Sequence, residues 1–244
     1  MGLDEVTTIL DALTPLIAIA GGIIAALKFI GVRTRNEKMR EVGEDFRTVV
    51  ASLSSDNEVQ RLSAAILLRR FFDPLTEFGI AGTPYAKEAV GVIASLLRDM
   101  PAGKLQKLLS DGLAYAPDLR NADLQHTNLS QAYLGNRVRK GIDISGADFF
   151  EADLSGTSLN GITAEDAVFY QAICCKTRFA GAQLRGTDFR DADLQGARFD
   201  GADLTGAQFD NSQLEGARFP DVTGLAPDIA SRLDTQSVYH ADAN

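Results

Sequence analysis

The sequence predicts α-helices in its first half and a repeat solenoid in its second half. Three observations carry this prediction: an uncharged apolar run at residues 12–27, helix start and stop signals between residues 34 and 110, and a strict five-residue period from Leu119 to Phe219. Neither the helical period of about 3.6 nor the strand period of about 2 produces a repeat of five. The 244-residue length accommodates one large domain or two small ones.

The first element is the apolar segment near the N-terminus. Residues 12–27 carry no charge, and the segment reaches residue 32, or 21 positions, if the Lys28 amine extends to the membrane surface. A transmembrane helix requires about 20 residues. We expect residues 1–32 to form a single transmembrane anchor. The alternative is a buried or interfacial helix, because the uncharged stretch is short and Gly21 and Gly22 weaken a helix in water.

Charges on either side of this segment predict its orientation. Acidic residues precede it, and the basic residues Arg33, Arg35, Lys38 and Arg40 follow it. The positive-inside rule then places the N-terminus outside a bacterial inner membrane and the remaining chain in the cytoplasm. Small residues at four-residue spacing let two membrane helices approach closely. We therefore expect a homo-oligomer, with helix packing at Ala18, Gly22 and Ala26.

Residues 33–116 are expected to form a helical connector and an N-terminal cap. Ser55 and Glu58 have the spacing of a capping box, which predicts a helix start. A second helix begins at Pro84, since proline is favoured at the first helical position. A short third helix spans about residues 102–110. We expect these helices to pack on one another and to cover the first coil of the repeat.

The second half consists of five-residue units such as NADLQ, SGADF, RDADL and DGADL. We call the large apolar residue of each unit the centre. There are 21 centres from Leu119 to Phe219, and 17 of them are Leu or Phe. The residue two positions before the centre is Ala, Thr or Ser in 17 of the 21 units. A fixed short period indicates a solenoid, in which each unit buries its inner face against its neighbours.

These units resemble the bacterial pentapeptide-repeat family, whose pattern is A(D/N)LXX, over about residues 117–222. The resemblance implies a mainly β fold: a right-handed quadrilateral β-helix of about five coils, with one pentapeptide on each side and twenty residues in each coil. The centre and the small residue two positions before it then point inward. Residues 223–244 are expected to form a capping helix, from Pro227 to about Leu233, and a flexible tail.

Sampling the centres every twenty residues predicts how they stack. Two Phe-rich columns alternate with two Leu-rich columns, which would fill a narrow interior without polar atoms. The Phe-rich columns are Leu129, Phe149, Phe169, Phe189, Phe209 and Leu119, Arg139, Leu159, Phe179, Phe199, Phe219. The Leu-rich columns are Leu134, Leu154, Cys174, Leu194, Leu214 and Leu124, Ile144, Ala164, Leu184, Leu204.

Arg139 occupies a centre, where an unpaired buried charge would be costly. Residues 135–141 are therefore expected to bulge outward as a loop. This loop is a candidate recognition element through Arg137, Arg139 and Lys140; tolerated local irregularity is the alternative.

The ionisable residues argue against an enzyme. An Asp before the centre, as in Asp148 or Asp188, belongs to the repeat pattern, and rows of exposed acids without partners have no reason to shift their pKa values. The chain has two adjacent cysteines and two histidines, with no nucleophile–base pair, metal-ligand spacing or phosphate-binding loop. We expect no catalytic residue, no metal and no cofactor.

One basic feature interrupts the acidic repeat. Arg178, Arg198 and Arg218 recur at twenty residues and should form a ladder on one side of the solenoid. Such a ladder could dock an acidic partner or another copy of the solenoid. The alternative is that these arginines only balance neighbouring acids for solubility.

Composition leaves two functional classes open. Residues 117–244 carry 11 basic and 19 acidic side chains, a net charge of −8, which disfavours direct nucleic-acid binding. The first hypothesis is a non-enzymatic, membrane-anchored scaffold for protein–protein interaction or self-assembly, including an effector that perturbs the membrane; its protein partner is not identified by the sequence. The second is an acidic DNA mimic that binds a type II topoisomerase, a role implied by the family resemblance.

Overall fold

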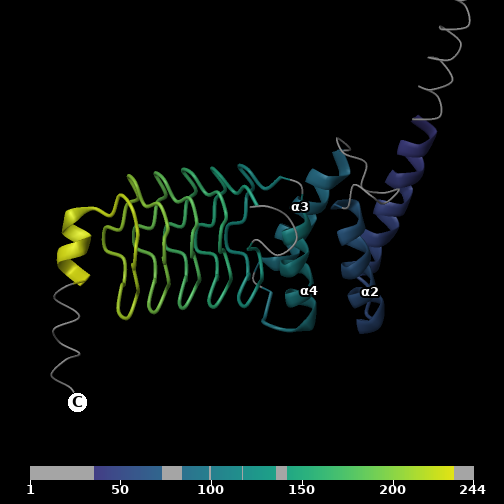
Figure 1. Cartoon of the computed structure of the whole chain (residues 1–244). Helices are drawn as coiled ribbons and strands as arrows, with labels where there is room; N and C mark the ends of the chain where they lie inside the picture. Colours follow the sequence, from purple (N-terminus) through teal and green to yellow (C-terminus); the bar gives the residue numbers. More distant parts are fainter. Residues whose placement is uncertain (1–35, 73–83, 99, 117, 136–141, 234–244) are drawn as a thin grey trace, which may run out of the picture. The chain divides into compact units, whose positions relative to one another are not determined.

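The computed structural model describes residues 36–72, 84–98, 100–116, 118–135 and 142–233 (Figure 1). The chain divides into two compact units, Met1–Asp45 and Phe46–Asn244. In the first unit, residues 36–45 are helical. The second unit holds further helices and the solenoid.

The predicted membrane segment lies outside the described residues, as do Ala18, Gly22 and Ala26. Within the ranges that are described, no helix has the length and apolar character needed to cross a bilayer. The candidate recognition residues Arg137, Arg139 and Lys140 also fall outside the described ranges.

Helices in the second unit follow the predicted order with shifted ends. They are α2 (Glu58–Leu68), η1 (Arg69–Phe72), α3 (Pro84–Leu97), α4 (Lys104–Gly112) and η2 (Leu113–Tyr115), and residues 46–53 are also helical. The capping box predicted at Ser55 and Glu58 is wrong. Asn57 caps α2 instead, because its side-chain oxygen accepts a hydrogen bond from Gln60 N–H at 3.2 Å.

The helices share an apolar core. The Phe46 ring packs edge-on against Phe71, with 5.1 Å between centroids, and lies 5.6 Å from the Tyr85 ring. Leu68, Leu97 and Leu113 are completely buried. This packing joins α2, α3 and α4, of which α3 and α4 lie next to the first coil and α2 lies on their far side (Figure 1).

The coils are held by parallel bridges between residues twenty apart. Bridging residues follow one another at intervals of five, so four occur in each coil and the coil has four sides. We name the sides by their bridged residues: side A is Asp123, Asp148, Val168, Asp188 and Gln208; side B is Asn128, Asp153, Ile173, Asp193 and Gln213; side C is Tyr133, Ser158, Arg178, Arg198 and Arg218; side D is Asp143, Thr163, Gln183, Asp203 and Thr223.

Each side therefore stacks five residues, as five coils require. The expectation of a mainly β chain needs correction, since the described residues contain isolated bridges and no continuous strand. The physical reason is that each side of a coil is short. Two of every five residues form the corner turn, which leaves one bridged residue between two corners.

The first coil is offset from the predicted columns. Its bridges join residues 25 apart, as in Asp123 with Asp148, whereas later bridges join residues twenty apart. Leu124 therefore precedes Phe149, and its N–H donates to Asp148 C=O at 2.8 Å. Leu119, Leu124, Leu129 and Leu134 each lie one side away from their predicted columns. The extra five residues fall between residues 133 and 143, where the sequence predicted a loop.

From Phe149 onward the predicted columns are confirmed. On side A, the Phe149 and Phe169 rings are parallel with centroids 4.7 Å apart, and the column continues through Phe189 and Phe209. On side C, Phe179, Phe199 and Phe219 stack at 5.0 and 4.7 Å. The two columns meet edge to face across the interior, an arrangement that aromatic rings favour.

Corner turns explain the recurring glycines. The residue two positions after a centre adopts a left-handed conformation, with φ of +66° at Gly146 and +64° at Gly186. Asn or Asp occupies the equivalent position in some other turns, for example Asn121 and Asp191, and Gln, Glu, His or Lys occupies it in the rest, for example Gln131 and Lys176. Gly, Asn and Asp tolerate positive φ best, so the turns with longer side chains are held in this conformation by the pairing of the coils.

Helices contact both ends of the solenoid. Residues 227–233 form the predicted C-terminal helix, in yellow in Figure 1, with Ile229 buried. The Arg232 guanidinium donates to Phe209 C=O at 3.2 Å and to Ser212 C=O at 2.8 Å. At the other end, the Gln106 side chain of α4 donates to the carbonyls of Asn128 and Ser130.

Candidate functional site

The acids on the sides of the solenoid have structural partners. The side chain of an Asp before a centre accepts a hydrogen bond from the N–H two residues later, over 2.9–3.1 Å. The acids that do so are Asp143, Asp148, Asp153, Asp188, Asp193 and Asp203. Each carboxylate thereby caps a corner turn, which corrects the expectation that these acids lack partners.

Several of these carboxylates also have shifted pKa values. The hydrogen bond from the Arg190 side chain lowers the pKa of Asp188, against the effect of burial. Hydrogen bonds from the Thr205 hydroxyl and then from Arg185 lower the pKa of Asp203 well below its ordinary value. Both acids are ionised at neutral pH, and their arginine partners lie 2.7 Å away. Part of the negative surface is therefore neutralised locally.

The structure places Arg178, Arg198 and Arg218 on side C, in three successive coils. All three are exposed. Arg198 pairs with Asp200 at 2.9 Å, whereas Arg178 and Arg218 have no ion pair within the described ranges. The ladder is thus a basic stripe, partly neutralised at its middle member.

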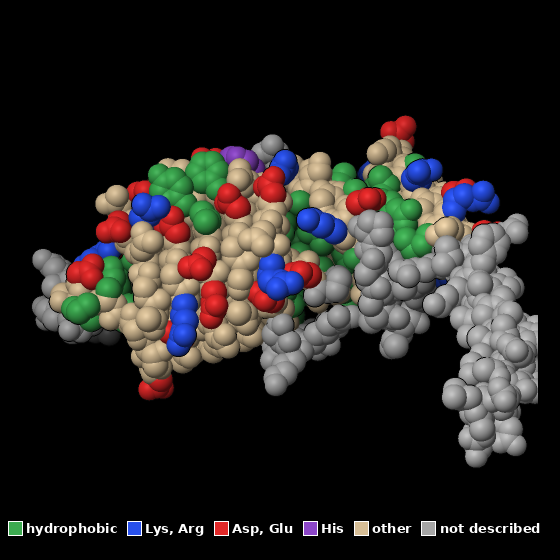
Figure 2. All heavy atoms as spheres, turned by 90° about the horizontal axis from the view of Figure 1, so that it is seen from above, with side chains coloured by type: hydrophobic (Ala, Val, Ile, Leu, Met, Phe, Trp, Pro, Cys, Tyr) green, Lys and Arg blue, Asp and Glu red, His purple; other side chains and the backbone are tan. Residues whose placement is uncertain are grey.

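A partly exposed aromatic corner lies between sides A and B and was not predicted from the sequence. Phe150 and Tyr170 stack with ring centroids 5.8 Å apart, and His126 packs edge-on against Phe150 at 5.4 Å. The Arg190 guanidinium lies 5.8 Å from the Tyr170 ring centroid. Figure 2 shows histidine beside hydrophobic side chains on this face, and Ile173 on the adjoining side B is 44% exposed. We call His126, Phe150, Tyr170 and Arg190 the aromatic corner.

A sequence signal for the aromatic corner was present. Phe150, Tyr170 and Arg190 lie at twenty-residue spacing, each directly after a side A centre. Sampling this outward position in the way that the centres were sampled would have found the column. The 25-residue offset of the first coil places Gln125 in this column, and the next residue, His126, contacts the Phe150 ring and lies 3.2 Å from Glu151.

The cysteines lie side by side in the chain but differ in environment. Cys174 fills a centre and is fully buried. Burial, and then a hydrogen bond to Asp193 at 3.0 Å, raises the pKa of the Cys175 thiol to about 11. The thiol therefore stays protonated at neutral pH. In the described part of the chain, no three His, Cys, Asp or Glu side chains come together as a metal site.

Comparison with known families gives one match. The model of the pentapeptide repeats matches residues 147–182 and 182–220, with eight copies. These repeats imply a right-handed β-helix solenoid, in agreement with the bridge pattern described above. No curated protein sequence matches the chain.

Several solved structures with similarity to this chain are described as pentapeptide-repeat proteins. HetL from the cyanobacterium Nostoc sp. strain PCC 7120, described as involved in heterocyst differentiation regulation, is 25% identical over 44% of this chain and 55% of its own, with a TM-score of 0.34. A protein of the Arabidopsis thaliana thylakoid lumen is 23% identical over 56% of this chain and 82% of its own, with a TM-score of 0.22.

QnrB1, a plasmid-mediated fluoroquinolone resistance protein, is 21% identical over 49% of this chain and 82% of its own, with a TM-score of 0.18. This chain spans about half the length of HetL.

Proposed function

Because this chain is a pentapeptide-repeat protein over residues 147–220, we propose that it acts as a non-enzymatic scaffold, with a rigid solenoid that binds a protein partner. The aromatic corner carries the proposal. Exposed aromatic and arginine side chains are enriched where proteins bind each other. Stacking in register on a bridged backbone limits the conformational entropy that these side chains lose on binding.

The surroundings of the ionisable groups support a role without catalysis. Asp188 and Asp203 cap turns and pair with arginines, which lowers their pKa values. A general acid or base needs a pKa near the working pH. The raised pKa of Cys175 likewise opposes a nucleophilic role for its thiol.

We further propose that residues 12–32 tether the solenoid to the bacterial inner membrane, with the repeats in the cytoplasm. The support is the uncharged apolar run and the basic residues that follow it. Alkaline carbonate extraction of the full chain beside a deletion of residues 1–32 tests this. An integral anchor leaves the full chain in the membrane pellet and releases the deletion variant. Extraction of the full chain into the supernatant would refute the tether.

Site-specific photo-crosslinking tests the interaction surface. A photo-reactive residue at Tyr170 reports on the aromatic corner, and one at Arg198 reports on the ladder of side C. Ala180, at the opposite corner between sides C and D, is the matched control. We expect one discrete crosslinked protein from position 170 that is absent from position 180. Equal crosslinking from both positions would contradict a specific aromatic corner.

The acidity of the repeat half favours a second candidate, a DNA mimic that binds a type II topoisomerase. Residues 117–244 have a net charge of −8. Ion pairs such as Arg190 with Asp188 and Arg185 with Asp203 reduce the free negative charge on the sides. Inhibition of topoisomerase-catalysed supercoiling by the purified full chain would favour this candidate over the scaffold.

A further inference from the structure

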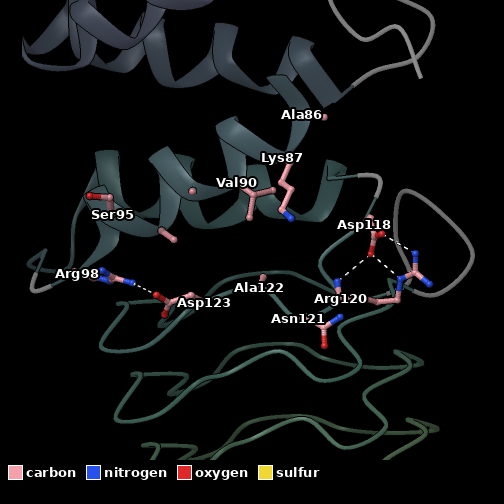
Figure 3. A pocket seen from close by; sticks show the side chains of 12 residues that line it. Ala86, Lys87, Val90, Ser95, Arg98, Asp118, Arg120, Asn121, Ala122 and Asp123 are labelled. Atoms are coloured by element: carbon pink, nitrogen blue, oxygen red, sulfur yellow. Dashed lines mark hydrogen bonds and ion pairs between the residues drawn. The ribbon is translucent and has the colours of Figure 1, made fainter. Parts of the chain in front are cut away.

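An open groove lies between α3 and the first coil (Figure 3). Its volume is about 700 Å³, within the range of about 300–1,000 Å³ that is typical of ligand sites. One wall is the face of α3 that includes Lys87, continued by Arg98 directly after the helix. The other wall is the free edge of the first coil at residues 118–123. The groove is large enough to hold a short extended peptide.

The coil edge in this groove has unpaired backbone groups. Along side A, each bridged residue directs both its N–H and its C=O toward the preceding coil. Asp148 is an example, because its N–H donates to Ala122 C=O at 2.9 Å and its C=O accepts from Leu124 N–H at 2.8 Å. Asp123 is the first residue of side A and has no preceding coil. Its N–H and C=O form no hydrogen bond with any described residue.

Neighbouring sides show that such an edge is normally paired. On side B, Asn128 N–H donates to Leu97 C=O at 2.8 Å, and Asn128 C=O accepts from the Gln106 amide at 3.1 Å. On side C, Tyr133 N–H donates to the Asp111 carboxylate at 2.9 Å. The helices therefore replace the missing coil on sides B and C. Over side A the described helices do not pair with the backbone of Asp123, and the groove lies between them and the coil. A backbone edge without a partner can accept an added strand.

Small residues on α3 keep the groove open. Ala86, Gly91, Ala94 and Ser95 line it, and a Cβ atom added at Gly91 would meet no atom within 4 Å. A helix wall of this kind lets a peptide backbone approach the coil edge.

The charges in the groove point to an acidic occupant. Arg98 pairs with Asp123 at 2.6 Å, and Arg120 pairs with Asp118 at 2.7 Å. Lys87 is exposed, forms no ion pair among the described residues, and points from α3 toward the coil edge. Three basic and two acidic side chains line the groove, which gives it a net charge of +1; they are Lys87, Arg98 and Arg120, and Asp118 and Asp123. This is opposite to the net −8 of residues 117–244.

We propose that this groove binds an extended segment of a partner protein that carries a carboxylate side chain. The peptide backbone pairs with the N–H and C=O of Asp123, as a short strand added before the first coil. The carboxylate pairs with the ammonium group of Lys87. This inference goes beyond the scaffold role by assigning a second surface, and it does not depend on the aromatic corner.

Selection from a displayed library of random peptides against the purified full chain tests the proposal. Peptides of about seven residues, at about 3.3 Å per residue, are long enough to form a short strand. We expect enrichment of peptides that contain Asp or Glu. In titrations with the enriched peptide, Lys87→Ala should weaken binding about fivefold. Gly91→Trp fills the groove and should weaken binding by about tenfold or more.

Glu88→Trp is the matched control, because Glu88 is exposed on α3 but does not line the groove. It should retain binding, and circular dichroism should show that all three variants are folded. Recovery of no acidic binder, or equal binding by Gly91→Trp and the control, would overturn the proposal.

Hydrogen exchange of the Asp123 backbone amide reports directly on backbone pairing, whereas the side-chain variants do not. Its N–H should exchange rapidly in the free chain and about tenfold more slowly with the enriched peptide bound. Protection of this amide in the free chain would mean that residues of the chain itself occupy the edge, and would also overturn the proposal. Either failure leaves the crosslinking result at the aromatic corner unaffected.

Discussion

Phe189 stacks on Phe169 with ring centroids 5.0 Å apart, although twenty residues separate them in the chain. Phe189 also stacks on Phe209 at 5.2 Å and meets Phe179 and Phe199 edge to face. It is fully buried. The five-residue repeat thus becomes a continuous aromatic column, and we expect a substitution in the middle of that column to be poorly tolerated.

Phe189→Asp should unfold the solenoid. Loss of a buried Phe side chain costs about 3–5 kcal/mol by itself, and an unpaired buried carboxylate adds to that cost. Arg198→Asp is the matched control, since Arg198 is exposed on side C. Circular dichroism and thermal melting should show a cooperative transition for the control only. A native melt for Phe189→Asp would show that the centres do not point inward.

Gln106→Leu should weaken the N-terminal cap. The buried Gln106 amide donates to Asn128 C=O at 3.1 Å and to Ser130 C=O at 3.2 Å. Leucine fills similar space but leaves both carbonyls without a donor, at a cost of about 1–3 kcal/mol. Urea denaturation measures the loss. An unchanged midpoint would mean that water replaces the amide at this edge.

Arg232→Ala should loosen the last coil. The guanidinium donates to Phe209 C=O and to Ser212 C=O, and its loss should cost about 1–2 kcal/mol. Hydrogen exchange should accelerate in the last coil and stay unchanged near Phe149. Arg232→Lys keeps the charge but cannot donate to both carbonyls in the same geometry, so an intermediate effect is expected. Uniform acceleration along all coils would argue against a local cap.

The ionised carboxylate of Asp118 should stabilise the folded chain, and this contribution should be lost in acid. Hydrogen bonds from the Arg120 side chain and backbone N–H lower the pKa of Asp118 from 3.8 to about 2. Because the pKa in the folded state is depressed, the contribution is fully present above pH 3.8 and disappears as the pH falls toward 2. An NMR titration of the carboxyl carbon measures this pKa. In Arg120→Ala it should rise toward 3.8, and a low value retained in that variant would exclude Arg120 as the cause.

Cys175 should react slowly with alkylating reagents. Burial and the hydrogen bond to Asp193 raise the pKa of its thiol to about 11, so little thiolate is present at pH 8. Asp193→Asn should lower this pKa and speed iodoacetamide labelling severalfold. Cys175→Ser identifies the labelled site, since Cys174 is fully buried. Equal labelling rates for the native chain and Asp193→Asn would contradict the role of Asp193.

The repeat could be predicted from sequence because its order is local. A large apolar residue every five positions, with a small residue two positions before it, specifies which side chains point inward. From Phe149 to Phe219 one coil follows another without insertion, so residues twenty apart stack as predicted. Most corner turns are also marked locally, because Gly, Asn or Asp occupies most of the described positions where φ is positive; Gln131 and Lys176 are exceptions.

The sequence by itself determined the period, the inward face and the Phe columns of this protein. Tertiary structure alone decided the side on which the first coil begins. A five-residue insertion preserves the five-residue register. The sequence therefore cannot distinguish a column in which Leu124 precedes Phe149 from one in which Leu129 does. The pairing between coils decides for Leu124. Only the docking of α3 and α4 decides which coil edge is covered. That choice depends on contacts between distant residues, such as Asn128 with Leu97, which no local pattern encodes.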